Sequence, residues 1–166
     1  MSIIYKPKKD VELFAPFGPT MGYFRMPYEL VEKLNSKMSD KLKSYADNLV
    51  GKVSEELAFD EEILAIAQKG LGQFVGQYQA YTDFRNSMGV KKPDTDKFDY
   101  GLQIVSGWFV RQFENEYNPL HIHTGSRLSC VGYLKLPEGI EEEWEEDYKD
   151  HHPANGHIQF AHGTSA

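Results

Sequence analysis

The chain has 166 residues, of which 40% are hydrophobic and 26% charged, and this composition fits one globular domain with a substantial core. The net charge of -7 is concentrated in residues 138–150, which hold eight acidic residues and one lysine, so the remainder is balanced. Because Lys and Arg are not clustered, the composition argues against a nucleic-acid interface. We expect a single domain over residues 1–166, with a supporting part at 1–97 and a β-rich core at 98–166.

Cysteine usage and hydropathy indicate the compartment. The N-terminus has no extended apolar core, and no later segment reaches the length of a bilayer span, so we expect neither a signal peptide nor a membrane partner. The one cysteine, Cys130, cannot form an internal disulfide, and its apolar surroundings predict a small buried side chain. These features predict a cytoplasmic protein.

The first half of the chain predicts short strands and then two helices. The strands are expected near residues 3–5, 12–15 and 20–25, separated by prolines. Apolar residues at helical spacing predict an amphipathic helix from Pro27 to about Asn48. The positions that carry this pattern are Leu30, Val31, Leu34, Met38, Leu42, Tyr45 and Leu49.

A second helix is predicted after Asp60, which is suited to cap an acidic first turn. Its inward positions are Ile63, Ala67, Leu71, Phe74 and Tyr78. Three glycines, Gly70, Gly72 and Gly76, weaken the helix. They indicate either close packing against a sheet or a break near Gly70.

From residue 98 onward the pattern changes to strands. They are expected at 102–105, 108–113, 120–123, 128–136 and 157–160. Helices followed by a run of strands predict an α+β domain in which the N-terminal helices brace one face of an antiparallel sandwich.

The segment His121-Ile122-His123 is the clearest candidate for chemistry. In a strand, side chains two residues apart project from the same face, so the two imidazoles would point together. Two nitrogen donors on one face can share a metal ion. The alternative is two polar residues on a solvated face. We call His121 and His123 the histidine pair.

The flanking residues resemble a known family. An aromatic and cationic stretch at Trp108, then Tyr117-Asn118-Pro119 before the histidine pair, and Ser129 with Tyr133-Leu134 after it, resemble the phage-type branch of the Fe(II)- and 2-oxoglutarate-dependent oxygenases. The resemblance covers about residues 102–160. His123 stands where most members of that superfamily have Asp, so the usual set of two histidines and one carboxylate is not complete in this segment.

The resemblance implies a fold, cofactors and site residues. It implies a double-stranded β-helix, which is a jelly-roll variant related to cupins. Fe(II) would be bound by the histidine pair, and the cofactor 2-oxoglutarate by Tyr133, with Ser129 on the same face and Arg111 on the neighbouring strand. The enzyme would hydroxylate an unknown small-molecule or protein substrate with dioxygen, in the host cytoplasm if the chain is encoded by a bacteriophage.

The sequence ends before the pattern of such relatives is complete. A distal histidine ligand and a basic residue for 2-oxoglutarate are expected after the last strand, so we expect a jelly roll that is incomplete at the C-terminus. All six histidines follow position 120, and His151, His152, His157 and His162 are therefore alternative ligands. The first two are better explained by an exposed turn.

Other interpretations remain open. The acidic segment 138–150 is expected to be a solvated loop or short helix, or else a lid that closes Trp144 and Tyr148 over a cationic substrate. A cupin-like metal-binding protein is one alternative to the oxygenase, although Arg127 stands where cupins place a glutamate. A non-catalytic phage module for binding or structure is the other.

Overall fold

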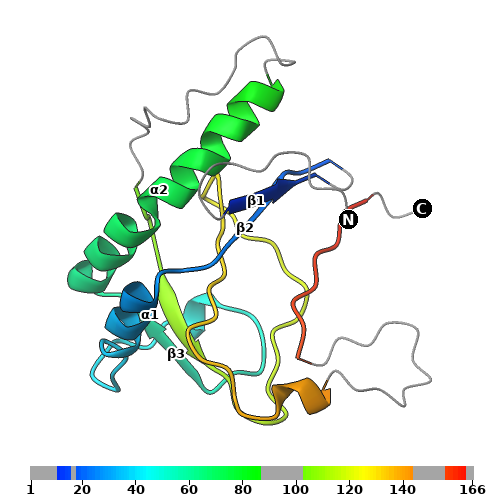
Figure 1. The fold of residues 1–166 in the computed structure, drawn as a ribbon. Helices are drawn as coiled ribbons and strands as arrows, with labels where there is room; N and C mark the ends of the chain where they lie inside the picture. Colours follow the sequence, from blue (N-terminus) through cyan, green and yellow to red (C-terminus); the bar gives the residue numbers. More distant parts are fainter. Residues whose placement is uncertain (1–10, 16–17, 87–102, 144–155, 164–166) are drawn as a thin grey trace.

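The structure, a computed structural model, describes residues 11–15, 18–86, 103–143 and 156–163. This part of the chain contains two α-helices and two separate antiparallel sheets of two strands each, and Figure 1 shows their arrangement. The elements are β1 (Val11–Phe14), β2 (Met21–Phe24), α1 (Tyr28–Asn35), η1 (Ala46–Asn48), β3 (Glu55–Ala58), α2 (Glu61–Asn86), β4 (Trp108–Arg111) and η2 (Ile140–Glu143). The predicted α+β class is confirmed.

The predicted second helix is confirmed as α2. Asp60 caps its first turn, because the Ile63 backbone N–H donates to Asp60 Oδ1 at 2.9 Å. The helix continues through Gly70, so the alternative of a break there is wrong. A Cβ on Gly70 would lie 2.5 Å from Leu30 Cδ1, and glycine therefore lets α1 approach α2 closely.

The helix predicted over residues 27–48 is wrong in its second half, because α1 ends at Asn35. The Ser36 hydroxyl donates to a carbonyl of the last turn at 2.8 Å. Short polar side chains compete in this way with the helical backbone bonds. Met38 and Leu42 still pack against the core, but from irregular chain, so their apolar spacing reflects burial rather than helix.

Two clusters of buried apolar side chains form the core, and α2 contributes to both. The first contains Leu30, Leu34, Ile63, Ala67 and Phe109, and the second contains Leu13, Phe74 and Tyr81. The first cluster joins α1 and α2 to β4, and the second joins β1 to α2. Phe24 of β2 stacks on Phe74 with the ring centroids 4.1 Å apart, which fixes the β1–β2 hairpin on the helix.

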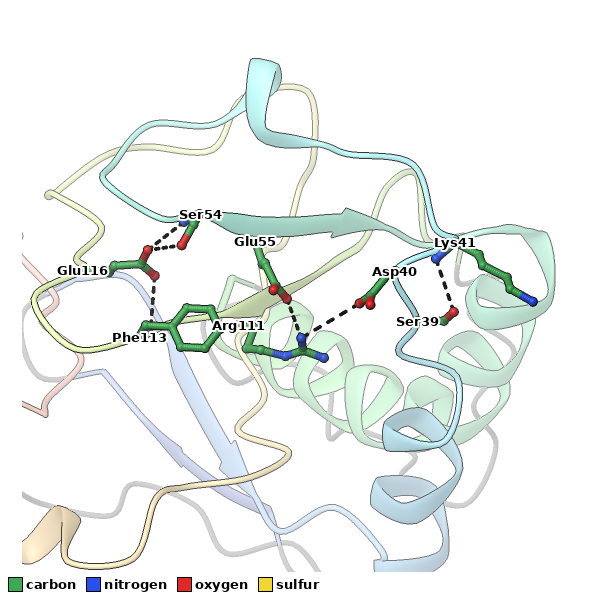
Figure 2. Close-up of polar contacts among 8 residues, drawn as sticks. All are labelled: Ser39, Asp40, Lys41, Ser54, Glu55, Arg111, Phe113 and Glu116. Atoms are coloured by element: carbon green, nitrogen blue, oxygen red, sulfur yellow. Dashed lines mark hydrogen bonds and ion pairs between the residues drawn. The ribbon is translucent and has the colours of Figure 1, made fainter.

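Strand β3 is not predicted from the sequence, because two consecutive glutamates mask its alternation. It pairs antiparallel with β4, with Leu57 opposite Phe109 and Glu55 opposite Arg111. Figure 2 shows the Arg111 guanidinium beside Glu55, with Nη1 2.6 Å from Glu55 Oε2. One face of this sheet thus carries an apolar pair and an ion pair, and Trp108 lies on the other face.

Beyond β4, the described residues form no further strand. Irregular backbone replaces the strands expected at 120–123, 128–136 and 157–160, and residues 103–105 are irregular as well. An alternating pattern forms a strand only where a second strand supplies backbone partners, and these segments have none in the described ranges. Neither sheet closes a barrel there, and the double-stranded β-helix stays a prediction.

The prediction that Cys130 is buried is wrong. Cys130 and Leu136, which the alternation of residues 128–136 places inside, are both exposed. The surrounding chain still desolvates the thiol, which raises the pKa of Cys130. Leu128 and Leu134 of the same alternating set are half-buried, and Leu134 packs against the first cluster. Without a strand partner the segment does not keep one face against the core along its whole length, so Cys130 and Leu136 stay exposed.

In the described part of the acidic segment, residues 138–143, the short helix η2 forms with Glu141 and Glu142 exposed, as a solvated short helix requires. Several predictions lie outside the described residues, namely those on residues 3–5, Trp144, Tyr148, His151 and His152. Within the described ranges, no helix combines the length and hydrophobicity that a bilayer crossing requires.

The packing of Phe109 predicts a large stability effect. Phe109 is 4% exposed, and its replacement by alanine leaves a cavity between the helices and β4. We expect Phe109→Ala to lower the free energy of unfolding by about 3–5 kcal/mol in urea denaturation. Val110→Ala on the same strand is the control, because Val110 is 40% exposed. Equal losses in the two variants would contradict this core assignment.

Candidate metal site

The histidine pair converges although its segment is not a strand. His121 Nε2 and His123 Nε2 lie 3.3 Å apart, and the two rings meet edge to face with centroids 4.8 Å apart. Both side chains are exposed. The shared direction of the two imidazoles therefore comes from the local irregular backbone and not from strand alternation.

The spacing of the two nitrogens fits a shared metal ion. Two imidazole nitrogens bound to one ion at about 2.0–2.1 Å lie about 3.3–3.4 Å apart in a tetrahedral site and about 2.8–3.0 Å apart in adjacent octahedral positions. The observed separation of 3.3 Å is close to both values, and it is also a hydrogen-bond distance between the two rings. No group of three or more His, Cys, Asp or Glu side chains converges within residues 11–15, 18–86, 103–143 and 156–163. The described chain thus offers two nitrogen ligands.

The tautomer of His121 leaves its Nε2 suited to bind a metal. His121 Nδ1 lies 2.7 Å from the Pro119 carbonyl oxygen. A carbonyl oxygen only accepts hydrogen bonds, so Nδ1 carries the proton and Nε2 keeps its lone pair. Metal-binding histidines are commonly oriented by a bond of this kind from the other ring nitrogen.

An aromatic stack supports the second member of the pair. The Trp108 ring lies against His123 with centroids 5.8 Å apart, and Tyr45 stacks on Trp108 at 5.1 Å. Trp108 begins β4, and the Tyr45 backbone N–H donates to the Glu56 carbonyl of β3 at 2.8 Å. The β3–β4 sheet therefore provides the surface on which His123 rests.

The Glu116 carboxylate forms hydrogen bonds that hold the turn between β4 and the histidine pair. Glu116 accepts hydrogen bonds from the Ser54 backbone N–H at 3.0 Å, from the Ser54 hydroxyl, and from the Phe113 N–H at 2.9 Å (Figure 2). The bond from the Ser54 hydroxyl, followed by that from Phe113, lowers the pKa of Glu116. This contact has no signal in the sequence, because it joins segments that are distant along the chain.

Arg111, a predicted contact of 2-oxoglutarate, lies in an ion pair. Its guanidinium is 2.6 Å from Glu55 and 4.0 Å from Asp40 (Figure 2). It shares the sheet face of Phe109, opposite the face on which Trp108 contacts His123. The structure therefore does not bring Arg111 to the histidine pair, and its cofactor role stays a prediction.

Tyr133 and Ser129 lie in the irregular chain that follows the pair. Tyr133 is 55% exposed, and partial desolvation raises the pKa of its phenol. Ser129 Oγ lies 3.5 Å from Ser126 Oγ. The two residues do not share a strand face as predicted, because no strand forms there. Their contact with a cofactor stays a prediction.

The other described histidines do not complete the site. A Cβ on Gly18 would lie 3.0 Å from His162 Nε2, which places that ring beside the connection between β1 and β2. His157 is exposed in the segment 156–163. Neither forms a group of three candidate ligands with the histidine pair.

Comparison with protein-family models, curated proteins and solved structures found no match for this chain.

Sequence reasoning also missed Glu56, a buried carboxylate near this site. Glu56 is 6% exposed and lies on the same face of the β3–β4 sheet as Trp108. Burial, and then the charge of Glu116, raise the pKa of Glu56. A carboxylate that must ionise in such surroundings opposes folding at neutral pH.

Glu56→Gln is therefore expected to raise the free energy of unfolding at pH 7. Because the pKa of Glu56 is raised by folding, the folded state holds this proton more tightly, and its penalty disappears as the pH falls through the raised pKa. The advantage of the variant should accordingly vanish below the ordinary carboxyl value of 4.5. Urea denaturation at several pH values measures this, and a variant less stable than the parent at pH 7 would refute it.

Proposed function

We propose that the chain is an Fe(II)- and 2-oxoglutarate-dependent oxygenase in which the histidine pair binds the metal ion. The observation that carries the proposal is the separation of 3.3 Å between His121 Nε2 and His123 Nε2. The resemblance of the flanking residues to phage-type oxygenases supports the choice of iron and 2-oxoglutarate. A double-stranded β-helix and a cytoplasmic location belong to the same proposal.

The residues of the chain have separable roles in this proposal. His121 donates its Nδ1–H to Pro119 and presents the Nε2 lone pair, while His123 presents Nε2 from a ring that rests on Trp108. Two neutral imidazoles suit ferrous iron and leave coordination positions for other ligands. When bound, Fe(II) and 2-oxoglutarate would supply the oxidation of a substrate by dioxygen.

A non-catalytic metal-binding module is the second candidate. His123 occupies the position of the usual carboxylate, and this replacement removes one negative charge from the ligand set. The described residues offer no third ligand in its place. Metal binding without turnover of 2-oxoglutarate would favour this candidate, and turnover that depends on added Fe(II) would favour the oxygenase.

Metal affinity is the first test of the histidine pair. We expect His121→Ala to weaken Fe(II) binding at least about a hundredfold in anaerobic calorimetry, because one of two protein ligands is lost. His157→Ala is the control, since it removes another exposed imidazole outside the pair. Unchanged affinity in His121→Ala, or an equal loss in both variants, would refute the site.

The phenol of Tyr133 is proposed to hold the far carboxylate of 2-oxoglutarate. Tyr133→Phe removes only the hydroxyl, and the loss of a charge-assisted hydrogen bond should weaken 2-oxoglutarate binding by about 1.5–3 kcal/mol. Tyr23→Phe on β2 is the control, because Tyr23 is similarly exposed, at 56% against 55%. Titration of 2-oxoglutarate into the metal-loaded protein measures the difference. Equal affinities of parent and Tyr133→Phe would remove this assignment.

A further inference from the structure

We infer that Glu116 is a positioning residue for the histidine pair: its carboxylate holds the turn that aims His121 Nε2 at His123 Nε2. The inference rests on the proposed metal role of the pair, and it assigns a function to a side chain that does not itself bind the metal. Three features of the described chain carry it, and they follow one another from β4 to His121.

The first feature is the arrangement of donors around the Glu116 carboxylate. One oxygen accepts from the backbone and the hydroxyl of Ser54, and the other accepts from the Phe113 N–H (Figure 2). Gln112 Nε2 also donates to the Glu116 carbonyl at 2.5 Å. Within the same turn Asn115 has φ 63°, a left-handed conformation that asparagine tolerates better than most residues. The carboxylate thus links the end of β4 to the start of β3.

The second feature is the backbone bridge that follows at once. The Lys52 N–H donates to the Tyr117 carbonyl at 2.9 Å, and the Tyr117 N–H donates to the Lys52 carbonyl at 3.1 Å. Gly51 has φ 130°, and a Cβ there would lie 2.8 Å from the Tyr117 carbonyl oxygen and would also collide with Asn118. The absence of a side chain at Gly51 therefore permits the two segments to pair.

The third feature is the short connection from this bridge to the metal ligands. Asn118 leads to Pro119, whose ring fixes φ and whose carbonyl accepts the Nδ1–H of His121. The segment around His121 has no regular secondary structure. The path of its backbone therefore depends on the position in which the Lys52–Tyr117 bridge holds the preceding residues. Releasing Glu116 would let the Pro119 carbonyl move away and would allow the His121 ring to rotate.

The charge of Glu116 alone does not explain such a role, and Glu114 provides the comparison. Glu114 lies in the same turn and carries the same charge. Among the described residues, however, its carboxylate accepts one hydrogen bond, a long one of 3.4 Å from Asn115 Nδ2. Removing either charge changes the attraction of a nearby cation. Only Glu116→Gln places an amide NH₂ opposite a backbone N–H, that of Ser54 or that of Phe113, which breaks part of the arrangement.

The experiment compares Glu116→Gln with Glu114→Gln. Titration with Co(II) measures metal affinity, and 15N NMR of the metal-free proteins measures the proportion of the His121 ring with the proton on Nδ1. We expect Glu116→Gln to bind Co(II) about tenfold more weakly than the parent and to lose the Nδ1–H tautomer, while Glu114→Gln changes neither by more than about twofold. Unchanged Glu116→Gln, or equal changes in both variants, would overturn the inference.

The two measurements, Co(II) affinity and the His121 tautomer, distinguish this inference from the metal proposal. If the parent protein does not bind Co(II), the metal proposal fails, and the His121 tautomer alone decides the role of Glu116. If Glu116→Gln does not fold, Gly51→Ala tests the same connection, with Gly163→Ala as the control because Gly163 also has positive φ, 152°, and nothing within 4 Å of its added Cβ. Loss of the tautomer in Gly51→Ala alone supports positioning, and its retention overturns it.

Discussion

The pairing of β3 with β4 is the constraint on which the rest of the structure depends. Its inner face contributes Phe109 to the main core, and its outer face presents Trp108 to His123. The pairing extends past the ends of the strands through Glu116 and through the bridge between Lys52 and Tyr117. One small sheet thereby joins the helical core to the exposed chain that holds the candidate ligands.

The sequence predicted the N-terminal half well wherever local signals agreed with burial. The cap at Asp60 and the apolar positions of α2 identify a helix because both local hydrogen bonding and packing favour it. The helical spacing of Met38 and Leu42 led to a wrong helix prediction, because these residues reach the core from irregular chain. Strand β3 was not predicted, because its residue Glu55 pairs with Arg111 across the sheet. No pattern in the local sequence indicates a partner so distant along the chain.

The candidate site shows the same division between local and distant information. The closeness of His121 and His123 in sequence and the bond to Pro119 bring the two rings together without the predicted strand, and the Glu116 turn is inferred to hold that bond in place. Tyr45 and Glu116 could not be predicted, because their contacts with Trp108 and Ser54 arise only when the sheet has formed. Arg111 was a reasonable candidate by type, but the register of β4 directs it to Glu55.

We propose above all that His121 and His123 bind one metal ion together. X-ray absorption at the iron edge, on protein loaded anaerobically with one equivalent of Fe(II), tests it most directly, because the outer-shell scattering of imidazole rings is distinctive. We predict a contribution from two imidazoles in the parent protein. A spectrum without an imidazole contribution, from protein that retains its iron, would contradict it.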